Sequence, residues 1–199
     1  MKLSQLVQAG AFATIAVFGS AHAATNLITN GDFENFAPFT GYVTLNAGAT
    51  SLAGWTVGDT SVDVINGGYG AISGNSIDML GTPGPGSLAQ TFATVAGGYY
   101  SLAFDLARNP SDSSLLTVSF GGTDSYTFTG TTTPTHYTQL FQALGNSTTL
   151  SFASAQVALN GGAVLDNVSV SAVPEPSTYA LMLGGLGLMG FMARRRKQA

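Results

Sequence analysis

Apolar and polar residues alternate in short runs through the middle of the chain, and no long segment repeats apolar residues every 3.6 positions as a helix does. The clearest run covers residues 99–107, where Tyr100, Leu102, Phe104 and Leu106 all fall on one side. A period of two is typical of a β-strand with one buried face. The pattern predicts further strands at residues 114–120, 148–154 and 164–170, and weaker ones at 42–45, 51–57, 61–65, 76–80, 88–95, 125–128 and 137–144.

Turn-forming residues separate these runs at intervals of roughly 8 to 15 residues. Many short strands without a repeat of 20 to 50 residues favour two packed antiparallel sheets over a solenoid or a propeller. We therefore predict an all-β, antiparallel two-sheet sandwich of the jelly-roll type. The residues expected in its core are Phe33, Trp55, Ile77, Leu88, Phe92, Leu102, Phe104, Leu106, Leu116, Val118, Phe152, Leu165 and Val168. In the last strand we expect Val164, Val168 and Val170 on one face, interrupted by Asp166.

The first residues have the pattern of a secretory signal peptide. Lys2 supplies a positive charge, residues 9–19 form an apolar stretch that is short for a membrane span, and residues 21–23 (Ala-His-Ala) match a cleavage site. The alternative is an uncleaved membrane anchor. We interpret residues 1–23 as a signal peptide and residues 24–172 as the folded domain.

The last segment, residues 173–199, has three consecutive parts. Val173, Pro174, Glu175 and Pro176 form a stiff turn, residues 177–193 are almost wholly apolar, and Arg194, Arg195 and Arg196 open a basic tail at 194–199. Seventeen helical residues span about 25 Å, slightly less than the ~30 Å hydrocarbon core. The sequence predicts a short transmembrane helix whose basic end stays cytoplasmic, with the domain outside. A permanent tail anchor is the alternative.

This three-part tail resembles the PEP-CTERM sorting signal of Gram-negative bacteria, in which a Val-Pro-Glu-Pro motif precedes a short span and an arginine-rich end. The resemblance implies that an exosortase, a membrane protease-transpeptidase, processes the chain near the motif. The protein would then be anchored transiently in the inner membrane through residues 177–193 and would finally reach the cell surface or the extracellular space.

Charge and cysteine content exclude several functions. Arg108 is the only basic residue between positions 24 and 172, against nine acidic ones, which gives a formal charge of −8. Phosphate neutralisation of nucleic acid, and binding of this domain to an anionic lipid surface, are therefore excluded. There is no cysteine, so disulfides, thiol chemistry and cysteine-based metal sites are absent. A surplus of carboxylates suggests either bound metal, with calcium the first choice, or plain solubility.

The central region also resembles a family. Residues 26–34 (NLITNGDFE) are similar to the opening strand of galactose-binding-like jelly rolls. Gly54-Trp55, residues 76–79 (SIDM), 104–110 (FDLARNP) and 165–168 (LDNV) follow in the order found in the choice-of-anchor and DUF642 families of extracellular proteins. The resemblance covers roughly residues 26–171. This chain has Arg108 where that subgroup has a glycine before Asn-Pro, so the role of that turn is in doubt.

In calcium-binding jelly rolls of this type, the opening segment and the closing strand meet at a structural Ca²⁺ ion. By motif position the resemblance implies Glu34 and Asp166 as ligands, with the carbonyl of Gly31 and with Asp32. Asp166 suits this role because it interrupts an apolar face, where an unpaired charge is costly. The alternative is that both carboxylates accept hydrogen bonds from backbone amides at turns, or face water.

Sugar-binding sandwiches stack aromatic rings on sugar faces beside polar side chains. Our candidates are Tyr69, in a glycine-rich loop, with Arg108 and Asn109 at a strand end; the other aromatic candidates are Tyr42, Tyr126, Tyr137 and Trp55, the last of which is expected in the core. Tyr69 could instead pack on the edge of the sandwich, and Arg108 could pair with Asp105 or Asp112.

Signals for catalysis are weak. No Gly-x-Ser-x-Gly elbow accompanies His136, which we expect to be exposed in a threonine-rich turn, and nine acids make chance carboxylate pairs plentiful. We therefore expect no enzyme and no catalytic residue. The preferred hypothesis is an exported module that binds polysaccharide, such as exopolysaccharide. The alternative is a purely structural biofilm or matrix protein that acts by self-association or covalent attachment. A hydrolase ranks third, and a buried carboxylate pair in a cleft would favour it.

Overall fold

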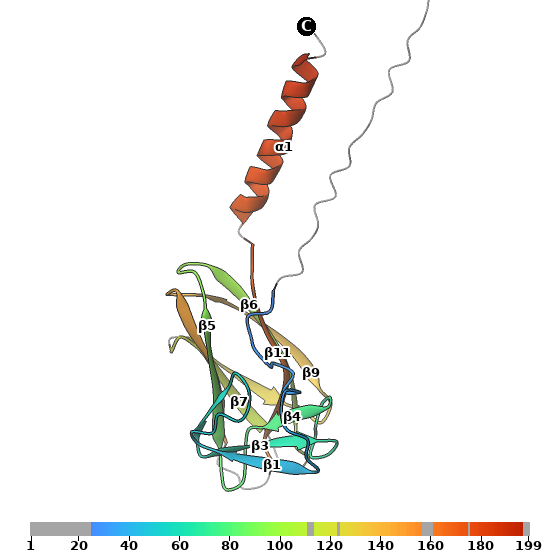
Figure 1. Ribbon diagram of the computed structural model, residues 1–199, viewed down its shortest axis with the longest axis vertical. Coiled ribbons are helices and arrows are strands. Elements are labelled where there is room, and N and C mark those ends of the chain that lie inside the picture. The colour runs from blue at the N-terminus through green and yellow to red at the C-terminus, as the bar shows by residue number, and fades with distance from the viewer. Residues whose placement is uncertain (1–24, 111–113, 123, 157–160, 175, 197–199) are drawn as a thin grey trace, which may run out of the picture.

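The computed structural model describes residues 25–110, 114–122, 124–156, 161–174 and 176–196. Eleven strands are followed by one helix in these residues (Figure 1). The strands are β1 (Tyr42–Asn46), β2 (Thr56–Asp59), β3 (Ser61–Asn66), β4 (Asn75–Asp78), β5 (Gly86–Ala93), β6 (Tyr99–Arg108), β7 (Ser114–Phe120), β8 (Asp124–Gly130), β9 (Thr135–Gln142), β10 (Ser147–Ser154) and β11 (Ala163–Ala172). The helix is α1 (Pro176–Arg196). The predicted signal peptide, residues 1–23, lies outside the described residues.

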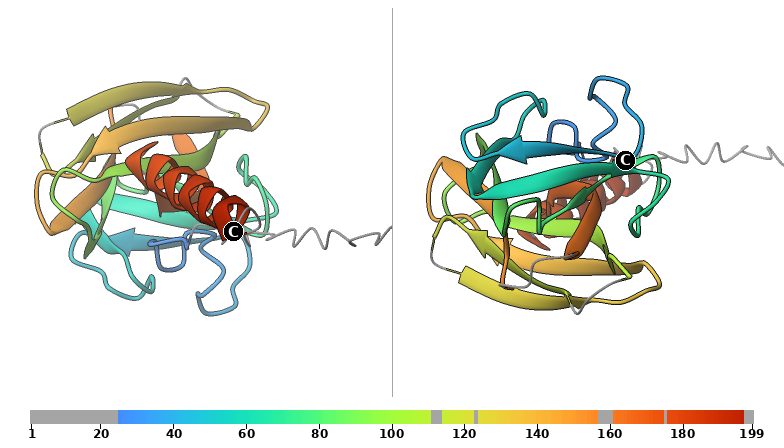
Figure 2. Two further views of the ribbon diagram at one scale, coloured as in Figure 1. Left: turned by 90° about the horizontal axis from the view of Figure 1, so that it is seen from above. Right: turned by 90° about the horizontal axis from the view of Figure 1, so that it is seen from below.

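The strands form two antiparallel sheets, which confirms the predicted fold class. The first sheet has the order β1-β3-β4-β11-β6-β9, and the second has the order β2-β5-β10-β7-β8. Neighbours in each sheet are mostly distant in sequence, as in a jelly roll: β11 lies between β4 and β6, and β10 lies between β5 and β7. Figures 1 and 2 show the strands around one interior, with α1 outside it.

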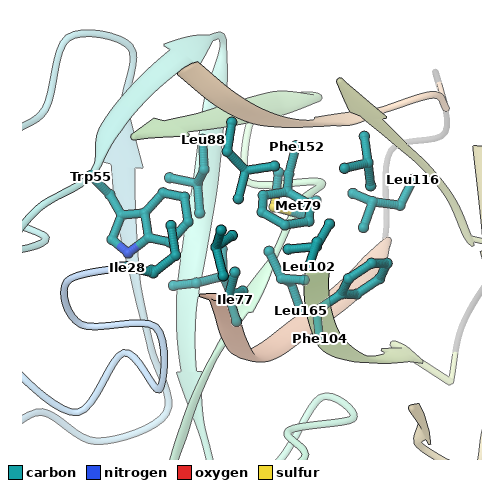
Figure 3. Packing of buried hydrophobic residues seen from close by; sticks show 14 of the residues in the cluster. Ile28, Trp55, Ile77, Met79, Leu88, Leu102, Phe104, Leu116, Phe152 and Leu165 are labelled. Atoms are coloured by element: carbon teal, nitrogen blue, oxygen red, sulfur yellow. The ribbon is translucent and has the colours of Figure 1, made fainter. Parts of the chain in front are cut away.

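One hydrophobic core fills the space between the sheets, and all thirteen residues predicted for it are buried. Aromatic rings lie at its centre (Figure 3). The ring centroid of Trp55 lies 5.7 Å from that of Phe33 and 6.1 Å from that of Phe152. The ring centroids of Phe152 and Phe104 are 5.5 Å apart. The indole nitrogen of Trp55 donates to the carbonyl of Asn30 at 3.0 Å, so the one polar atom of this side chain is also satisfied.

A β-bulge in β11 changes the predicted facing of its residues. The pairing with β6 shifts between Asp166 and Ser169, and Asn167 has a positive φ of 53°. Such a bulge places an extra residue in one strand and reverses the alternation beyond it. Leu165 therefore faces the main core together with Val168 and Val170, whereas Val164 packs on the other side of the sheet. The expectation that Val164 shares a face with Val168 and Val170 is wrong for this reason.

The opening segment, residues 26–34, is not a strand, in contrast to the expectation drawn from the family resemblance. It lies along β11, where the amide of Leu27 donates to the carbonyl of Val170 and the amide of Val168 donates to the carbonyl of Gly31, both at 2.8 Å. Asn30 and Phe33 have positive φ angles, which turn the chain away before a ladder can form.

The C-terminal segment forms α1, with three arginines in its last turn, where positive charge is favoured by the helix dipole. Among the residues that the structure describes, no helix is both long enough and apolar enough to cross a membrane. The expected span, residues 177–193, lies within α1. The segment contains four glycines and begins with Ser177, Thr178 and Tyr179, which lower its average apolarity.

Candidate functional site

Two exposed tyrosine rings meet at one end of the first sheet. Tyr69 lies in the loop between β3 and β4, and Tyr42 begins β1. Each residue is 49% exposed, and the ring centroids are 5.7 Å apart in an edge-to-face arrangement. Gly67 and Gly70 flank Tyr69, and all three have positive φ angles, so the loop turns sharply and carries the ring outward. The sequence named both tyrosines as candidates but could not show that they pair.

The same loop packs against the end of β6, where Arg108 and Asn109 lie. A methyl group at Gly70 would overlap the carbonyl oxygen of Arg108 and touch Asn109, so only glycine allows this close approach. Asn109 is anchored from the other side: its amide donates to the carbonyl of Gly162, and its Nδ2 donates to Asp78 Oδ2, both at 3.0 Å. The structure therefore brings Tyr69, Arg108 and Asn109 into one neighbourhood, with Tyr42 added.

The carboxylates of Glu34 and Asp166 bind one segment, residues 73–76, which ends the β3–β4 loop and begins β4. Glu34 Oε1 accepts the amide of Asn75 at 2.7 Å. Asp166 Oδ2 accepts the amide of Ser73 and the hydroxyl of Ser76, both at 3.2 Å. A methyl group at Gly74 would displace the Glu34 carboxylate, and the positive φ of 49° at this position also favours glycine. The opening segment and the closing strand are thus tied together through one loop.

The other two residues of the predicted calcium set are used differently. The carbonyl of Gly31 accepts the amide of Val168, and Asp32 Oδ1 accepts the amide of Glu34 at 3.4 Å. Within the described residues, no three His, Asp or Glu side chains come together as a metal site. The hydrogen-bond donors to Glu34 and Asp166 match the alternative to a calcium site, in which both carboxylates bind backbone amides. Two carboxylates that bind one short segment still supply the oxygen ligands that calcium uses.

Asp166 is fully buried, and its hydrogen-bond donors are neutral. Burial raises the pKa of Asp166 to about 7 because the charged form loses its hydration. Hydrogen bonds from Asn167, Ser76 and Ser73 lower this pKa, and the nearby Asp105 raises it further. The carboxylate is therefore costly to keep charged in this place.

Asp63 and Asp78 form a buried carboxylate pair that sequence analysis missed. They lie directly opposite each other on β3 and β4. Asp63 Oδ1 accepts the Thr44 hydroxyl at 2.6 Å, and Asp78 Oδ1 accepts the amide of Leu80 at 3.0 Å. Because these donors come from β1 and the loop after β4, the pair joins separate segments of the sheet edge. Both aspartates interrupt apolar strands in the sequence, which is the signal that could have found them.

The stability of the protein should depend on the protonation of Asp78. Burial raises the pKa of Asp78 from 3.8 to about 6, and Asp63 raises it further, against hydrogen bonds from Asn109, Leu80 and Gly162. The folded state thus binds this proton more tightly than the unfolded chain does. Protonated Asp78 therefore adds to the free energy of unfolding below pH 4, and this addition is lost as the pH rises through 6. The full effect is about 3 kcal/mol, of which about 1 kcal/mol falls between pH 5 and pH 7.

Urea unfolding of the wild type and of Asp78→Asn at pH 5 and pH 7 measures this contribution. The wild type should gain stability at pH 5, and Asp78→Asn should gain about 1 kcal/mol less. The exposed Asp124→Asn is the matched control and should follow the wild type. An equal gain in all three proteins would show that Asp78 does not titrate in this range.

His136 lies on strand β9 and not in a turn, which corrects the expectation, although its side chain is exposed as predicted. Its Nδ1 lies 2.7 Å from Asp105 Oδ1 on the neighbouring strand. Asn167 Nδ2 donates to the other oxygen of Asp105 at 2.8 Å, so three strands contribute to this group. Asp105 thus has two defined partners. The pairing of Arg108 with Asp105 or Asp112 stays a prediction, and Asp112 lies outside the described residues.

An open hollow of about 380 Å³ lies between the opening segment and β11. Its polar lining includes Asn26, Asn30, Asp32, Asn167 and Ser169. These side chains can bind hydroxyl groups, but the lining contains no aromatic ring. Sequence analysis missed the hollow because it depends on how the opening segment crosses β11.

The sorting segment continues directly from the last strand. The amide of Val173 donates to the carbonyl of Tyr99 at 2.8 Å, and α1 starts at Pro176. Glu175 lies outside the described residues. Proline at the first position of a helix is favourable because its missing N–H has no partner there.

Comparison with known proteins gives one curated relative and several similar folds. Halomucin of Haloquadratum walsbyi is 28% identical over 177 residues, which cover 81% of this chain and 2% of that protein. A CBM4 structure has 17% identity and a TM-score of 0.48 and covers 73% of this chain and 99% of its own. A family 35 carbohydrate binding module of Clostridium thermocellum has 16% identity and a TM-score of 0.42, with 64% and 97% covered. Similarity at this level concerns the fold alone.

Family profiles cover nearly the whole described chain. The profile of the PEP-CTERM protein-sorting motif matches residues 172–197, which confirms the resemblance of the tail and implies an exported protein. The profile of DUF642, a family described as proteins of unknown function, matches residues 26–171, well over half of the chain. The chain therefore belongs to the DUF642 family and carries a PEP-CTERM sorting motif at its C-terminus.

Proposed function

We propose that this exported protein is a non-catalytic module that binds polysaccharide through Tyr42, Tyr69, Arg108 and Asn109. The observation that carries the proposal is the pair of half-exposed tyrosine rings beside the end of β6. Aromatic faces bind the C–H faces of sugars, and neighbouring guanidinium and amide groups bind sugar hydroxyls.

Replacing both tyrosines tests this site. We expect Tyr42→Ala with Tyr69→Ala to weaken binding of the purified protein to the exopolysaccharide of its host at least tenfold, measured by calorimetry or by affinity electrophoresis. Tyr126→Ala is the control, since Tyr126 is 37% exposed on β8. If the double variant binds normally while Asp32→Ala loses binding, the ligand lies in the polar hollow and the tyrosine site is wrong.

We further propose a structural calcium ion at Glu34 and Asp166, with carbonyl oxygens of the surrounding loops. The support is that a fully buried carboxylate and a second carboxylate both bind residues 73–76, with Gly74 packed against the second. Calcium would replace the amide donors of this loop and tie the ends of the domain together.

The thermal midpoint of the purified protein should therefore rise in millimolar calcium and fall in a chelator, because a ligand of the folded state stabilises it. A shift of several degrees is expected. Glu34→Gln should abolish the shift, whereas the exposed Asp124→Asn should retain it. An identical midpoint in calcium and chelator would leave the two carboxylates as hydrogen-bond acceptors only.

The partner in sorting is proposed to be an exosortase-type transpeptidase, and the final location is proposed to be the cell surface or the extracellular polymer. The support is the match of the sorting motif together with the direct passage from β11 into that motif.

A structural matrix role is the second candidate, and the second sheet favours it. The outward-facing positions of its three central strands carry only small, hydroxylated or apolar side chains: Ser87, Ala89, Thr91, Leu115, Thr117, Ser119, Thr149, Ser151 and Ala153. Copies that repel one another through their acidic surfaces could approach through this uncharged face. Concentration-dependent association in sedimentation, abolished by Thr117→Lys with Ser151→Lys, would support this role over glycan binding.

A further inference from the structure

The first residue of the sorting motif, Val173, directly follows β11 and is hydrogen-bonded to the sheet. Ala172, the last residue of β11, lies opposite Tyr100, and the amide of Val173 bonds to the carbonyl of Tyr99 at 2.8 Å. Only two residues, Pro174 and Glu175, separate Val173 from the start of α1. Two residues reach about 7 Å at full extension, so the motif cannot move far from the end of the domain.

Exposed apolar side chains surround this exit point. Val173 and Tyr99 are cross-strand neighbours, and Leu140 lies opposite Ser101, so all three face outward at the same end of the first sheet. The tips of the loops β5–β6 and β9–β10 add Val95 and Leu144. These loops are joined by hydrogen bonds from Gly97 to the carbonyl of Ala143 and from Ala143 to the carbonyl of Gly98, at 2.7 and 2.9 Å.

We call these five residues the exit patch. Their exposed fractions are 68% for Val95, 45% for Tyr99, 53% for Leu140, 72% for Leu144 and 38% for Val173. Figure 1 shows β11 leading into α1 at this end of the domain. A hollow of about 90 Å³ adjoins Leu144 and is lined partly by Phe120 and Phe141.

The exit patch also differs from the rest of the domain in charge. Residues 94–101, 140–148 and 170–174 contain no charged side chain, although the domain as a whole has a formal charge of −8. A group of exposed apolar side chains without charges favours an interaction site, because its burial against a partner removes apolar area from water without desolvating a charge.

We infer that the exit patch is a docking surface for the sorting transpeptidase, a contact outside the motif itself. Val173 belongs to both the motif and the patch, so an enzyme that binds residues 173–176 must also come against Tyr99 and its neighbours. The contact surface of the enzyme would be apolar and uncharged. Docking there would place the enzyme beside the end of β11, where the motif begins. The inference rests on one part of the proposed function, the processing of the tail by a sorting enzyme. It does not depend on glycan binding.

The test uses the full-length chain in cells that contain the sorting enzyme, with conversion to the shortened form followed by pulse-chase. Tyr99→Ser with Leu140→Ser should slow conversion about tenfold, and Val95→Ser with Leu144→Ser, which leaves both strands unchanged, should slow it severalfold. The matched control is Leu115→Ser with Tyr126→Ser, exposed apolar residues on the second sheet, which should stay within twofold of the wild type.

An insertion of six Gly and Ser residues between Ala172 and Val173 should also slow conversion, because it moves the motif away from the patch. Faster conversion of this variant would show that the domain only obstructs the motif and would overturn the inference. Patch variants that convert at the wild-type rate would overturn it as well.

A change of oligomeric state in sedimentation, with unchanged conversion, would assign the patch to self-association instead. Normal conversion after replacement of the motif itself would contradict the proposed processing of the tail. That result would be distinct from a failure of the exit patch.

Discussion

Replacing Phe152 by alanine is expected to lower the free energy of unfolding by about 3–5 kcal/mol. Phe152 lies on β10, a central strand of the second sheet, is completely buried, and contacts the rings of Trp55 and Phe104. The substitution removes the transfer free energy of the ring and leaves a cavity that rigid neighbouring rings cannot fill. A loss of this size is a large part of the 5–15 kcal/mol that stabilises a typical domain.

Urea unfolding of the purified protein measures this loss. Leu115→Ala is the control, because Leu115 also lies on a central part of the second sheet but faces outward and is 37% exposed. Its substitution should change the free energy of unfolding by about 0.5 kcal/mol or less. Equal effects of the two substitutions would contradict the position of the core between the sheets.

Replacing Pro174, Glu175 and Pro176 together by alanine is expected to reduce the processed, released form of the protein at least tenfold. The matched motif begins at the end of β11, and the substitutions leave the described core and all strand pairings untouched. Alanine is a good helix former, so α1 should still form. Processing is measured by immunoblots of cells and medium in a host that contains the sorting enzyme.

The control for this experiment is Ser169→Ala with Ser171→Ala, a change of similar size on the same strand before the motif. The control variant should be released normally. If the triple variant is released to the same extent as the control, the motif is not the signal that directs release.

The alternation of residue types was enough to predict the architecture and the core. From Tyr100 to Leu106 every second side chain is apolar or aromatic, and burial follows that alternation along this part of β6. Local pattern succeeds here because a strand in a two-layer sandwich must put one face into the core. The sorting signal of the tail could also be predicted from the sequence, because a motif, an apolar stretch and an arginine cluster are local features.

The sites were less predictable, because each combines residues that are far apart in the chain. Glu34 and Asp166 were named from family resemblance, but only the structure shows that both bind the loop before β4. The pairing of His136 with Asp105 depends on strand register, which alternation alone does not specify. The edge-to-face contact of Tyr42 with Tyr69 depends on a loop in which Gly67, Tyr69 and Gly70 have positive φ angles.

By itself, the sequence determined that this protein is exported, that its domain is a β-sandwich without cysteines, and which side chains fill the core. These properties follow from composition and from short-range periodicity. The tertiary structure decided which strands are neighbours, where β11 bulges, which carboxylates become buried, and how exposed apolar residues gather around the sorting motif. These four features depend on contacts between distant segments. The free energy of such contacts is set by packing and register and not by any local pattern.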